Sequence, residues 1–250
     1  MENKEVNKIA GNPEASYLNG LIAAYGFASN YDGVAHPSQP NYLALVSGST
    51  QGVSDDSSHN INAPNLADQL EAAGKSWRVF AQNLSNGCFT GDSSKGGADG
   101  SGAYKRKHEP FISFASVSGN PARCANITDF SHFDPAAADF ELIVPNQVNS
   151  MHDGSVAEGD AFLRDFVPHI LDSPAYQQGG LLVITWDEGS SNAGGGGHVA
   201  TLVISPRTPA GTTSDTSYSH YSLLRTIEDA WGLDCLANAC DAPNMAAFFR

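Results

Sequence analysis

The sequence has few basic side chains and no long apolar run. Its 250 residues include 13 Lys and Arg against 27 Asp and Glu, which gives a formal net charge of -14. Nucleic-acid backbones and anionic membranes attract clusters of Lys and Arg, so we exclude a general binder of either. No apolar run reaches the roughly 18 residues that cross a bilayer, which excludes a transmembrane segment. An anionic substrate would need a local reversal of charge, which a divalent cation can supply.

Nucleotide-binding and zinc-binding signatures are missing too. No glycine pattern has dinucleotide spacing, no Gly-x-x-x-x-Gly-Lys-Ser/Thr phosphate loop occurs, and no Cys/His spacing indicates zinc. Cysteine is scarce but even in number, which in a chain rich in Gly, Ser and Asn favours two disulfides and an oxidising compartment. The expected pairs are Cys88 with Cys124 and Cys235 with Cys240.

The chain opens directly with Met1-Glu-Asn-Lys4 and shows no apolar leader. Export normally requires such a leader, whereas the cysteines favour an oxidising compartment. We therefore expect a secreted protein, periplasmic or extracellular, whose start has been cut.

Apolar residues follow two different patterns along the chain. Helical spacing occurs at residues 15–25, 66–73, 156–171 and 221–231. The runs between them are short and continuously apolar, at residues 77–81, 140–144, 181–186 and 199–204. Continuous apolar strands that alternate with helices indicate a parallel sheet covered on both faces. We predict an α/β fold, a three-layer α/β/α sandwich with a mostly parallel central sheet, in a single domain over residues 1–250.

Two adjacent acids, Asp187 and Glu188, follow the apolar run 181–186. Ligands of open α/β sheets bind beyond the carboxyl ends of the strands, so both acids are expected at the functional edge. Adjacent carboxylates repel unless a cation or solvent separates them. An ordinary polar turn explains this segment equally well when it is considered alone.

Ser38 lies in the segment His36-Pro-Ser-Gln-Pro-Asn-Tyr42, directly before an apolar stretch of helical composition. A position before a helix N-terminus favours an anion, because backbone N–H groups and the helix dipole point there. A simple helix cap is the alternative role for this serine. A serine hydroxyl becomes a nucleophile only when a base or a metal lowers its pKa, so Ser38 needs partners from elsewhere.

Histidines near acids form a third group of candidates: His108, His152 beside Asp153, His198 and His220. Each taken alone is more often a hydrogen-bonded structural group than a catalyst. All four lie at predicted junctions between loops and regular elements, and this shared location favours a common role.

These segments together resemble the phosphoesterase family of the alkaline phosphatase superfamily, which includes acid phosphatases, phosphatidylinositol 3-phosphatase-like proteins and phospholipases C. The similar segments run from the first to the last part of the chain: Met1-Glu-Asn-Lys4, residues 36–48, 65–77, 108–111, 151–153 and 159–160, Thr185-Trp-Asp-Glu-Gly189, His198 with 204–206, and Tyr218-Ser-His-Tyr-Ser222. Each segment is weak or moderate alone, and the set in this order is a strong signal.

The resemblance implies a role for each site residue. Glu2, Asn3, Asp187 and Glu188 would bind one divalent metal of unknown identity, and a second metal at His152, Asp153 or His220 stays open. Ser38 would be the nucleophile, and His220 and His152 would act in catalysis. The substrate phosphate or the leaving group would be bound by Asn41, His108, His198 and Asp153.

The implied reaction is metal-dependent hydrolysis of a phosphate monoester through a phosphoserine intermediate, on a small-molecule or lipid-headgroup phosphate ester. A phospholipase C-type phosphodiesterase is the alternative within the family, and a non-catalytic truncated relative is the alternative outside catalysis. A sulfatase is less favoured, because no Cys/Ser-x-Pro-x-Arg segment occurs. No partner protein is implied.

One departure from the family concerns the start of the chain. The family has an apolar strand before its Glu-Asn pair, whereas this sequence begins at that pair. We expect the domain to lack this first strand, Glu2 and Asn3 to lie on a frayed terminus, and metal binding to be weak.

Overall fold

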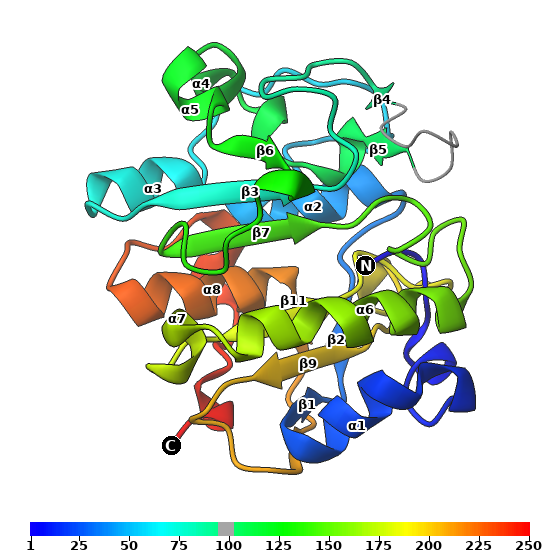
Figure 1. Ribbon diagram of the computed structural model, residues 1–250. Helices are drawn as coiled ribbons and strands as arrows, with labels where there is room; N and C mark the ends of the chain where they lie inside the picture. The colour runs from blue at the N-terminus through cyan, green and yellow to red at the C-terminus, as the bar shows by residue number, and fades with distance from the viewer. Residues whose placement is uncertain (95–102) are drawn as a thin grey trace.

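The computed structural model describes residues 1–94 and 103–250 and has helices on both sides of β-sheet (Figure 1). The larger sheet has the strand order β10-β1-β9-β8. Its strands are β1 (Gly26–Ala28), β8 (Leu182–Thr185), β9 (Thr201–Ile204) and β10 (Thr212–Ser214). β1 is parallel to β10, whereas β9 is antiparallel to both of its neighbours. The predicted continuous apolar runs therefore form strands, but one of them runs in the opposite direction.

The second sheet is parallel throughout and has the order β6-β3-β7. Two-stranded pairings join β2 to β11 in parallel and β4 to β5 antiparallel. The strands of these groups are β3 (Trp77–Ala81), β6 (Ile127–Asp129), β7 (Phe140–Val144), β2 (Tyr31–Asp32), β11 (Tyr218–Ser219), β4 (Ser93–Ser94) and β5 (Tyr104–Lys105). The predicted α/β architecture is confirmed, with the parallel pairing concentrated in this sheet.

The helices form pairs on opposite sides of the sheets: α1 packs on α6, and α2 packs on α8. The α-helices are α1 (Ser16–Ala24), α2 (Ser38–Ser47), α3 (Leu66–Ala72), α4 (Ala115–Ser118), α5 (Pro121–Cys124), α6 (Val156–Leu171), α7 (Pro174–Gln177) and α8 (His220–Trp231). Short 3-10 segments lie at Val6–Lys8, Pro13–Ala15, Arg106–His108, Phe111–Ser113, Phe130–His132, Ala193–Gly195, Ala237–Asp241 and Ala246–Phe248. The four helices expected from periodicity are all present.

Local sequence explains where the long helices begin and end. Asn65 caps α3 and Ser155 caps α6, each in a capping box with the residue three positions later. Gly48 and Gly232 end α2 and α8 in the left-handed conformation, which costs glycine little. Asp160 lies inside α6 but accepts the N–H groups of Tyr17 at 3.0 Å and Leu18 at 2.9 Å, so it caps α1 from a different helix.

Two apolar cores stabilise the fold, one for each sheet. The first core gathers buried side chains of α1, α6, β8 and β9, and the second gathers those of α3, β3 and the segments around β6. Leu45 of α2 and Ile227 of α8 pack against both cores. The two sheets are therefore joined through the α2–α8 layer.

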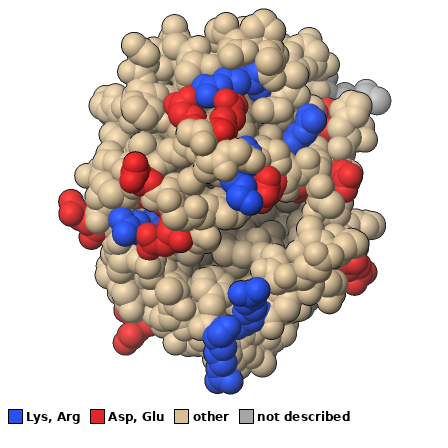
Figure 2. All heavy atoms as spheres, turned by 90° about the vertical axis from the view of Figure 1, so that its left-hand side faces the viewer, with Lys and Arg blue, Asp and Glu red and all other residues tan. Residues whose placement is uncertain are grey.

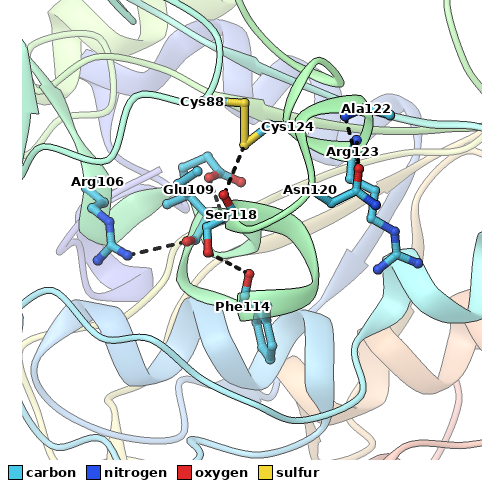
Figure 3. The surroundings of a disulfide bond; sticks show 10 residues. Cys88, Arg106, Glu109, Phe114, Ser118, Asn120, Ala122, Arg123 and Cys124 are labelled. Carbon is cyan, nitrogen blue, oxygen red and sulfur yellow. Dashed lines mark hydrogen bonds between the residues drawn. A yellow bond between two sulfur atoms is a disulfide. The ribbon is translucent and has the colours of Figure 1, made fainter.

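Both predicted disulfides are present. Cys88 pairs with Cys124 across 36 positions, and Cys235 pairs with Cys240 across five positions. Figure 3 shows the first bond beside Ser118, whose carbonyl lies 3.9 Å from the sulfur of Cys124. This bond ties the segment after β3 to α5.

The surface carries charges of both signs. Figure 2 shows Lys and Arg side chains interspersed with Asp and Glu on the side where β7 begins. Arg123, for example, pairs with Asp68 at 2.5 Å and Glu71 at 2.7 Å. None of the helices in the described part of the chain is both long and apolar enough to cross a membrane.

Candidate active site

Ser38 is the first residue of α2, as the sequence indicated. Its hydroxyl donates to Oε1 of Glu188 at 3.2 Å and lies 3.5 Å from Oε2 of Glu2. The three residues come from the start, the first quarter and the last third of the chain. The proposed nucleophile therefore lies against two of the four predicted metal ligands, although its side chain is only 1% exposed.

The first residues of the chain are held in place at this site. The amine of Met1 donates to the carbonyl of Thr185 at 3.0 Å, and the N–H of Asp187 donates to the carbonyl of Met1 at 3.1 Å. Glu2 donates its N–H to Ser150 at 2.8 Å and is 1% exposed. The expectation of a frayed terminus is therefore wrong, because β8 and the segment after β7 anchor these residues.

Asn3 and Asp187 supply oxygen atoms without partners. The N–H of Asn3 donates to Oδ1 of Asp187 at 3.1 Å, which brings the two side chains to the same place. The other oxygen of Asp187, Oδ2, and the amide oxygen of Asn3 are both buried and have no hydrogen bond. A buried oxygen without a donor is costly, and a cation would satisfy both atoms.

Glu2 is surrounded by groups that influence its protonation. The hydroxyl of Tyr42 donates to Oε1, and Nε2 of His108 lies 3.3 Å from Oε2, outside hydrogen-bonding geometry. Burial raises the pKa of Glu2 well above its usual value, and the charge of Asp187 adds to this effect. Burial also lowers the pKa of His108 well below its usual value, with Lys107 acting in the same direction. Close carboxylates of this kind gain most from a bound cation.

Glu188 has a second partner in His36, whose Nδ1 contacts Oε2 while Nε2 lies 2.9 Å from the carbonyl of Ser191. Burial raises the pKa of Glu188, and the charge of Asp187 raises it further. Burial opposes the charged form of His36, yet its bonds to Ser191 and Glu188 outweigh this and raise its pKa. A charged His36 would stabilise the carboxylate form of Glu188.

His220 and His198 have structural partners. Nε2 of His220 lies 2.6 Å from the carbonyl of Asp187, and Nδ1 lies 3.2 Å from the hydroxyl of Tyr31. The ring is buried, which lowers the pKa of His220. Nδ1 of His198 lies 2.9 Å from Asp32, and Nε2 lies 3.0 Å from the carbonyl of Ser29. Both nitrogens of each ring are thus engaged within the protein.

His152 and Asp153 lie on the accessible side of the site. Nδ1 of His152 is 2.7 Å from Asp153, and its ring centroid lies 6.1 Å from that of His108. Both residues line a pocket of about 480 Å³ that also contains Lys107 and Arg106. His152 is the predicted histidine that lines this pocket, whereas Glu2 and Ser38 are not part of its lining.

Asn41 has other partners than the expected phosphate oxygen. Its amide oxygen accepts the N–H groups of Val34 at 2.8 Å and Ala35 at 3.1 Å, and its amide nitrogen donates to the carbonyl of Ala35 at 2.7 Å. These bonds fix the loop that leads into Ser38. In this structure Asn41 positions the nucleophile segment.

Glu5 is a site residue that sequence reasoning missed. Oε2 accepts the N–H groups of Ser190 at 2.7 Å and Ser191 at 3.1 Å, and Oε1 accepts the N–H of His198 at 3.2 Å. A Cβ atom at Gly189 would come within 2.3 Å of this carboxylate, so the approach requires glycine. Glu5 thus anchors the loop that follows Asp187 and Glu188.

Tyr42 and His36 were also missed, although both lie in the quoted segment around Ser38. Tyr42 follows Ser38 by four positions on α2, so helical spacing puts both side chains on one face. That spacing could have predicted Tyr42 as a site residue. No sequence pattern indicated Glu5, because its partners come from the other end of the chain.

The donor set suits a hard divalent cation, because it consists of carboxylate oxygens and one amide oxygen. The unpartnered oxygens of Asn3 and Asp187 are the structural observation that favours it. Within residues 1–94 and 103–250, however, no three Asp, Glu, His or Cys side chains already form a metal-binding group. The carboxylates of Glu2 and Glu188 are instead engaged by Tyr42 and His36.

The sequence matches the Phosphoesterase family over residues 11–234. It is 34% identical to a phosphatidylinositol-3-phosphatase of Mycobacterium tuberculosis, over 97% of this chain and 78% of that protein. It is 32% identical to a probable acid phosphatase of Kluyveromyces lactis, over 93% of this chain and 57% of that protein. An acid phosphatase of Aspergillus fumigatus is 30% identical, over 84% of this chain and 50% of that protein. The chain thus spans only about half the length of the two fungal relatives.

Solved structures give the same fold. A protein in the alkaline phosphatase superfamily from Vibrio parahaemolyticus matches 99% of this chain and 70% of its own, with a TM-score of 0.62 and 11% identity. A phosphonate monoester hydrolase from Silicibacter pomeroyi matches 99% of this chain and 75% of its own, with a TM-score of 0.51 and 12% identity. The chain therefore belongs to the phosphoesterase family, and the predicted enzyme class, a hydrolase of phosphoric esters, is confirmed.

Proposed function

We propose that this protein hydrolyses phosphate monoesters through nucleophilic attack by Ser38 and a phosphoserine intermediate. The observation that carries the proposal is the hydrogen bond from the Ser38 hydroxyl to Glu188 at the first residue of α2. A helix N-terminus favours the phosphate, and a carboxylate in contact with the hydroxyl can take its proton. The names of the relatives, two acid phosphatases and a phosphatidylinositol-3-phosphatase, favour a monoester over a diester.

In the first step, the bond from Oγ of Ser38 to phosphorus forms and the ester bond to the alcohol breaks. The hydroxyl proton passes to Glu188, and the departing alcohol takes a proton from an acid near the substrate. We assign this role to His152 and not to His220, because both ring nitrogens of His220 already contact Asp187 and Tyr31. Water then attacks the phosphoserine with these proton transfers reversed, which releases phosphate.

We assign the divalent metal to Asn3, Asp187, Glu2 and Glu188. The support is the pair of unpartnered buried oxygens on Asn3 and Asp187 and the closeness of Glu2 to Asp187. When bound, such a metal lowers the pKa of a hydroxyl and neutralises charge on phosphate oxygens. Tyr42 and His36 would hold the two glutamates in place while the metal binds.

The burial of Ser38 sets a condition on the reaction. Because the side chain is 1% exposed, a phosphate reaches it only after a covering group moves. His36, which contacts Glu188 beside Ser38, has a side-chain exposure of 35% and marks the side from which a phosphate would approach.

The experiment is a comparison of Ser38→Ala with Ser47→Ala, a buried serine of the same helix that bonds only to the nearby backbone and Gln51. With Mg²⁺, Ca²⁺, Mn²⁺ or Zn²⁺ present, p-nitrophenyl phosphate turnover should fall by at least about 1,000-fold in the first variant and little in the second. Acid quenching followed by mass spectrometry should find the phosphoryl group on Ser38. A Ser38→Ala protein that keeps its turnover would contradict the assignment of Ser38 as the nucleophile.

Further substrates separate the alternatives in the same assay. Bis-p-nitrophenyl phosphate tests the phosphodiesterase, and a soluble phosphorylated inositol beside phosphatidylinositol 3-phosphate vesicles separates small-molecule from lipid substrates. We also propose that the protein works outside the cytoplasm, because its two disulfides suit an oxidising compartment. A thiol-reactive label applied to cell fractions tests this location. The protein should not react with the label, because its four cysteines would all be in disulfides.

A further inference from the structure

The pocket that His152 and Asp153 line has a volume of about 480 Å³ and a strongly charged wall. We call it the His152 pocket. Its charged lining, besides His152, consists of three consecutive basic residues and three acids: Lys105, Arg106, Lys107, Asp56, Asp92 and Asp153. A sequence with only 13 Lys and Arg thus places three of them at one pocket, and the reaction at Ser38 gives them no role.

The acids of the His152 pocket are compensated or solvated. Asp153 contacts Nδ1 of His152 at 2.7 Å, and Oδ2 of Asp56 binds Nζ of Lys107 at 2.6 Å. Asp92 is exposed to solvent, which screens its charge. Of the three cations at the pocket, these acids therefore engage only Lys107.

Lys105 and Arg106 have no carboxylate partner. Among residues 1–94 and 103–250, the ion pairs of Lys and Arg all involve other basic residues. Arg106, drawn in Figure 3, is 7% exposed, and its Nη2 donates to the carbonyls of His59 at 2.9 Å and Ile112 at 3.4 Å. Its Nε and Nη1 atoms are buried and have no hydrogen bond. Burial of an ionised group without an anion is costly, so an anion in the pocket would stabilise Arg106.

Glu109 does not supply the missing anion. Its buried carboxylate accepts the N–H groups of Phe111 at 3.0 Å and Ile112 at 2.9 Å and forms no ion pair with Arg106. Burial raises the pKa of Glu109 to about 7, so a large share of this group is neutral near that pH. The guanidinium of Arg106 therefore keeps an uncompensated positive charge at the wall of the His152 pocket.

The His152 pocket adjoins the proposed reaction centre. Oδ1 of Asp56 accepts the N–H of Gln39, the residue after Ser38, at 3.0 Å. Because adjacent residues are linked by a few bonds, this carboxylate lies within about 8 Å of the Ser38 hydroxyl. The ring of His152 lies 6.1 Å from that of His108, measured between centroids. A substrate whose reacting phosphate reaches Ser38 can therefore extend into the pocket over a few bonds.

We propose that the His152 pocket binds a second phosphate group of the substrate, so that the enzyme prefers bisphosphorylated molecules to simple monoesters. This inference rests on the proposed function, because the first phosphate must react at Ser38. Lys105 binds the second phosphate directly, and Arg106 adds its uncompensated charge from behind the pocket wall. A soluble bisphosphate and a doubly phosphorylated lipid headgroup share this chemistry, and the comparison of soluble and vesicle substrates described above separates them.

The turnover test uses two substrates that differ only in a second phosphate, butane-1,4-diol monophosphate and butane-1,4-diol bisphosphate. The two equivalent ends of the bisphosphate raise kcat/KM by about twofold through statistics alone. We expect kcat/KM of the parent to be at least about 20-fold higher for the bisphosphate. Lys105→Glu should lower this ratio to about two. Lys8→Glu, which makes the same charge change at an exposed lysine outside the pocket, should keep the ratio of the parent.

A binding test separates failure of this inference from failure of the proposed reaction. Butane-1,4-diyl bisphosphonate and butylphosphonate contain carbon–phosphorus bonds that a phosphatase does not hydrolyse, so isothermal titration measures affinity without turnover. In EDTA, where metal chelation contributes nothing, the parent should bind the bisphosphonate at least about tenfold more tightly than the monophosphonate. Lys105→Glu should lose this difference, and Lys8→Glu should keep it.

The two tests together distinguish the outcomes. A protein that hydrolyses neither ester but binds the bisphosphonate more tightly through Lys105 would contradict the reaction at Ser38 and support the pocket assignment. Equal affinity of the parent for the two phosphonates would overturn the inference. A difference that survives Lys105→Glu would overturn it as well, because the second phosphate would then bind elsewhere.

Discussion

Oε1 of Glu188 and Oγ of Ser38 lie 3.2 Å apart, although 150 positions separate the two residues in the chain. The contact depends on two structural elements. α2 presents Ser38 at its first residue, and the loop after β8 presents Glu188. Glu5 fixes that loop through Ser190 and Ser191, so a residue outside the proposed metal ligands helps to determine where Glu188 lies.

Removal of the unpartnered oxygens should weaken metal binding. We expect Asn3→Ala and Asp187→Asn each to lower the affinity for a divalent cation by at least about tenfold, because each removes a ligand from the proposed site. Asp172→Asn, at an exposed position, serves as the matched control. Isothermal titration with Mn²⁺ measures the affinity without substrate. An Asn3→Ala protein that binds as tightly as the parent would contradict the ligand assignment.

Asp160 should matter for stability rather than for turnover. Asp160→Ala leaves the N–H groups of Tyr17 and Leu18 at the start of α1 without this acceptor, and the bond to Leu18 is buried. The expected loss in the free energy of unfolding is about 2 kcal/mol. Urea unfolding measures it, and the exposed Asp165→Ala gives the reference. Equal stability of the two variants would show that this cap contributes little.

Glu228 should make stability depend on pH. Burial raises the pKa of this carboxyl to about 7, and its Oε2 atom has no hydrogen bond. Because the folded pKa lies above the unfolded value, its contribution is fully present below about pH 4.5 and is lost as pH rises through 7. Across this pH window, the free energy of unfolding of Glu228→Gln should therefore fall by about 2 kcal/mol less than that of the parent.

Urea unfolding at several pH values measures this difference, with the exposed Glu14→Gln as control. Glu109 and Glu141 also have pKa values raised by burial to about 7, and they stay in both proteins. The difference between the two curves thus isolates Glu228. Parallel curves would mean that Glu228 is ionised in the folded protein at lower pH than proposed.

Long elements were predictable because their apolar patterns are strong. α6 has the bounds that periodicity predicted, and β3 and β7 match the expected runs. β1 is only three residues long and shows no pattern of its own. The antiparallel direction of β9 could not be predicted either, because a continuous apolar run has the same pattern whether the strand is parallel or antiparallel to its neighbours.

The residues of the candidate site were also predictable only in part. The motifs located Ser38, Glu2, Asp187 and Glu188, and the structure brings these residues together. Motifs could not give the partners that come from distant loops, such as Asp32 beside His198. Asp160 illustrates the limit, since its sequence position suggests a role in its own helix and the folded chain uses it for another. Only tertiary packing decides such contacts.

The division of the interior into two apolar cores affects how the fold is stabilised. Leu45 and Ile227 are the side chains that pack against both, so little apolar surface is shared between the halves. The α2–α8 layer is therefore the part of the interior on which both halves depend, and a substitution that shortens Leu45 or Ile227 should weaken both halves together.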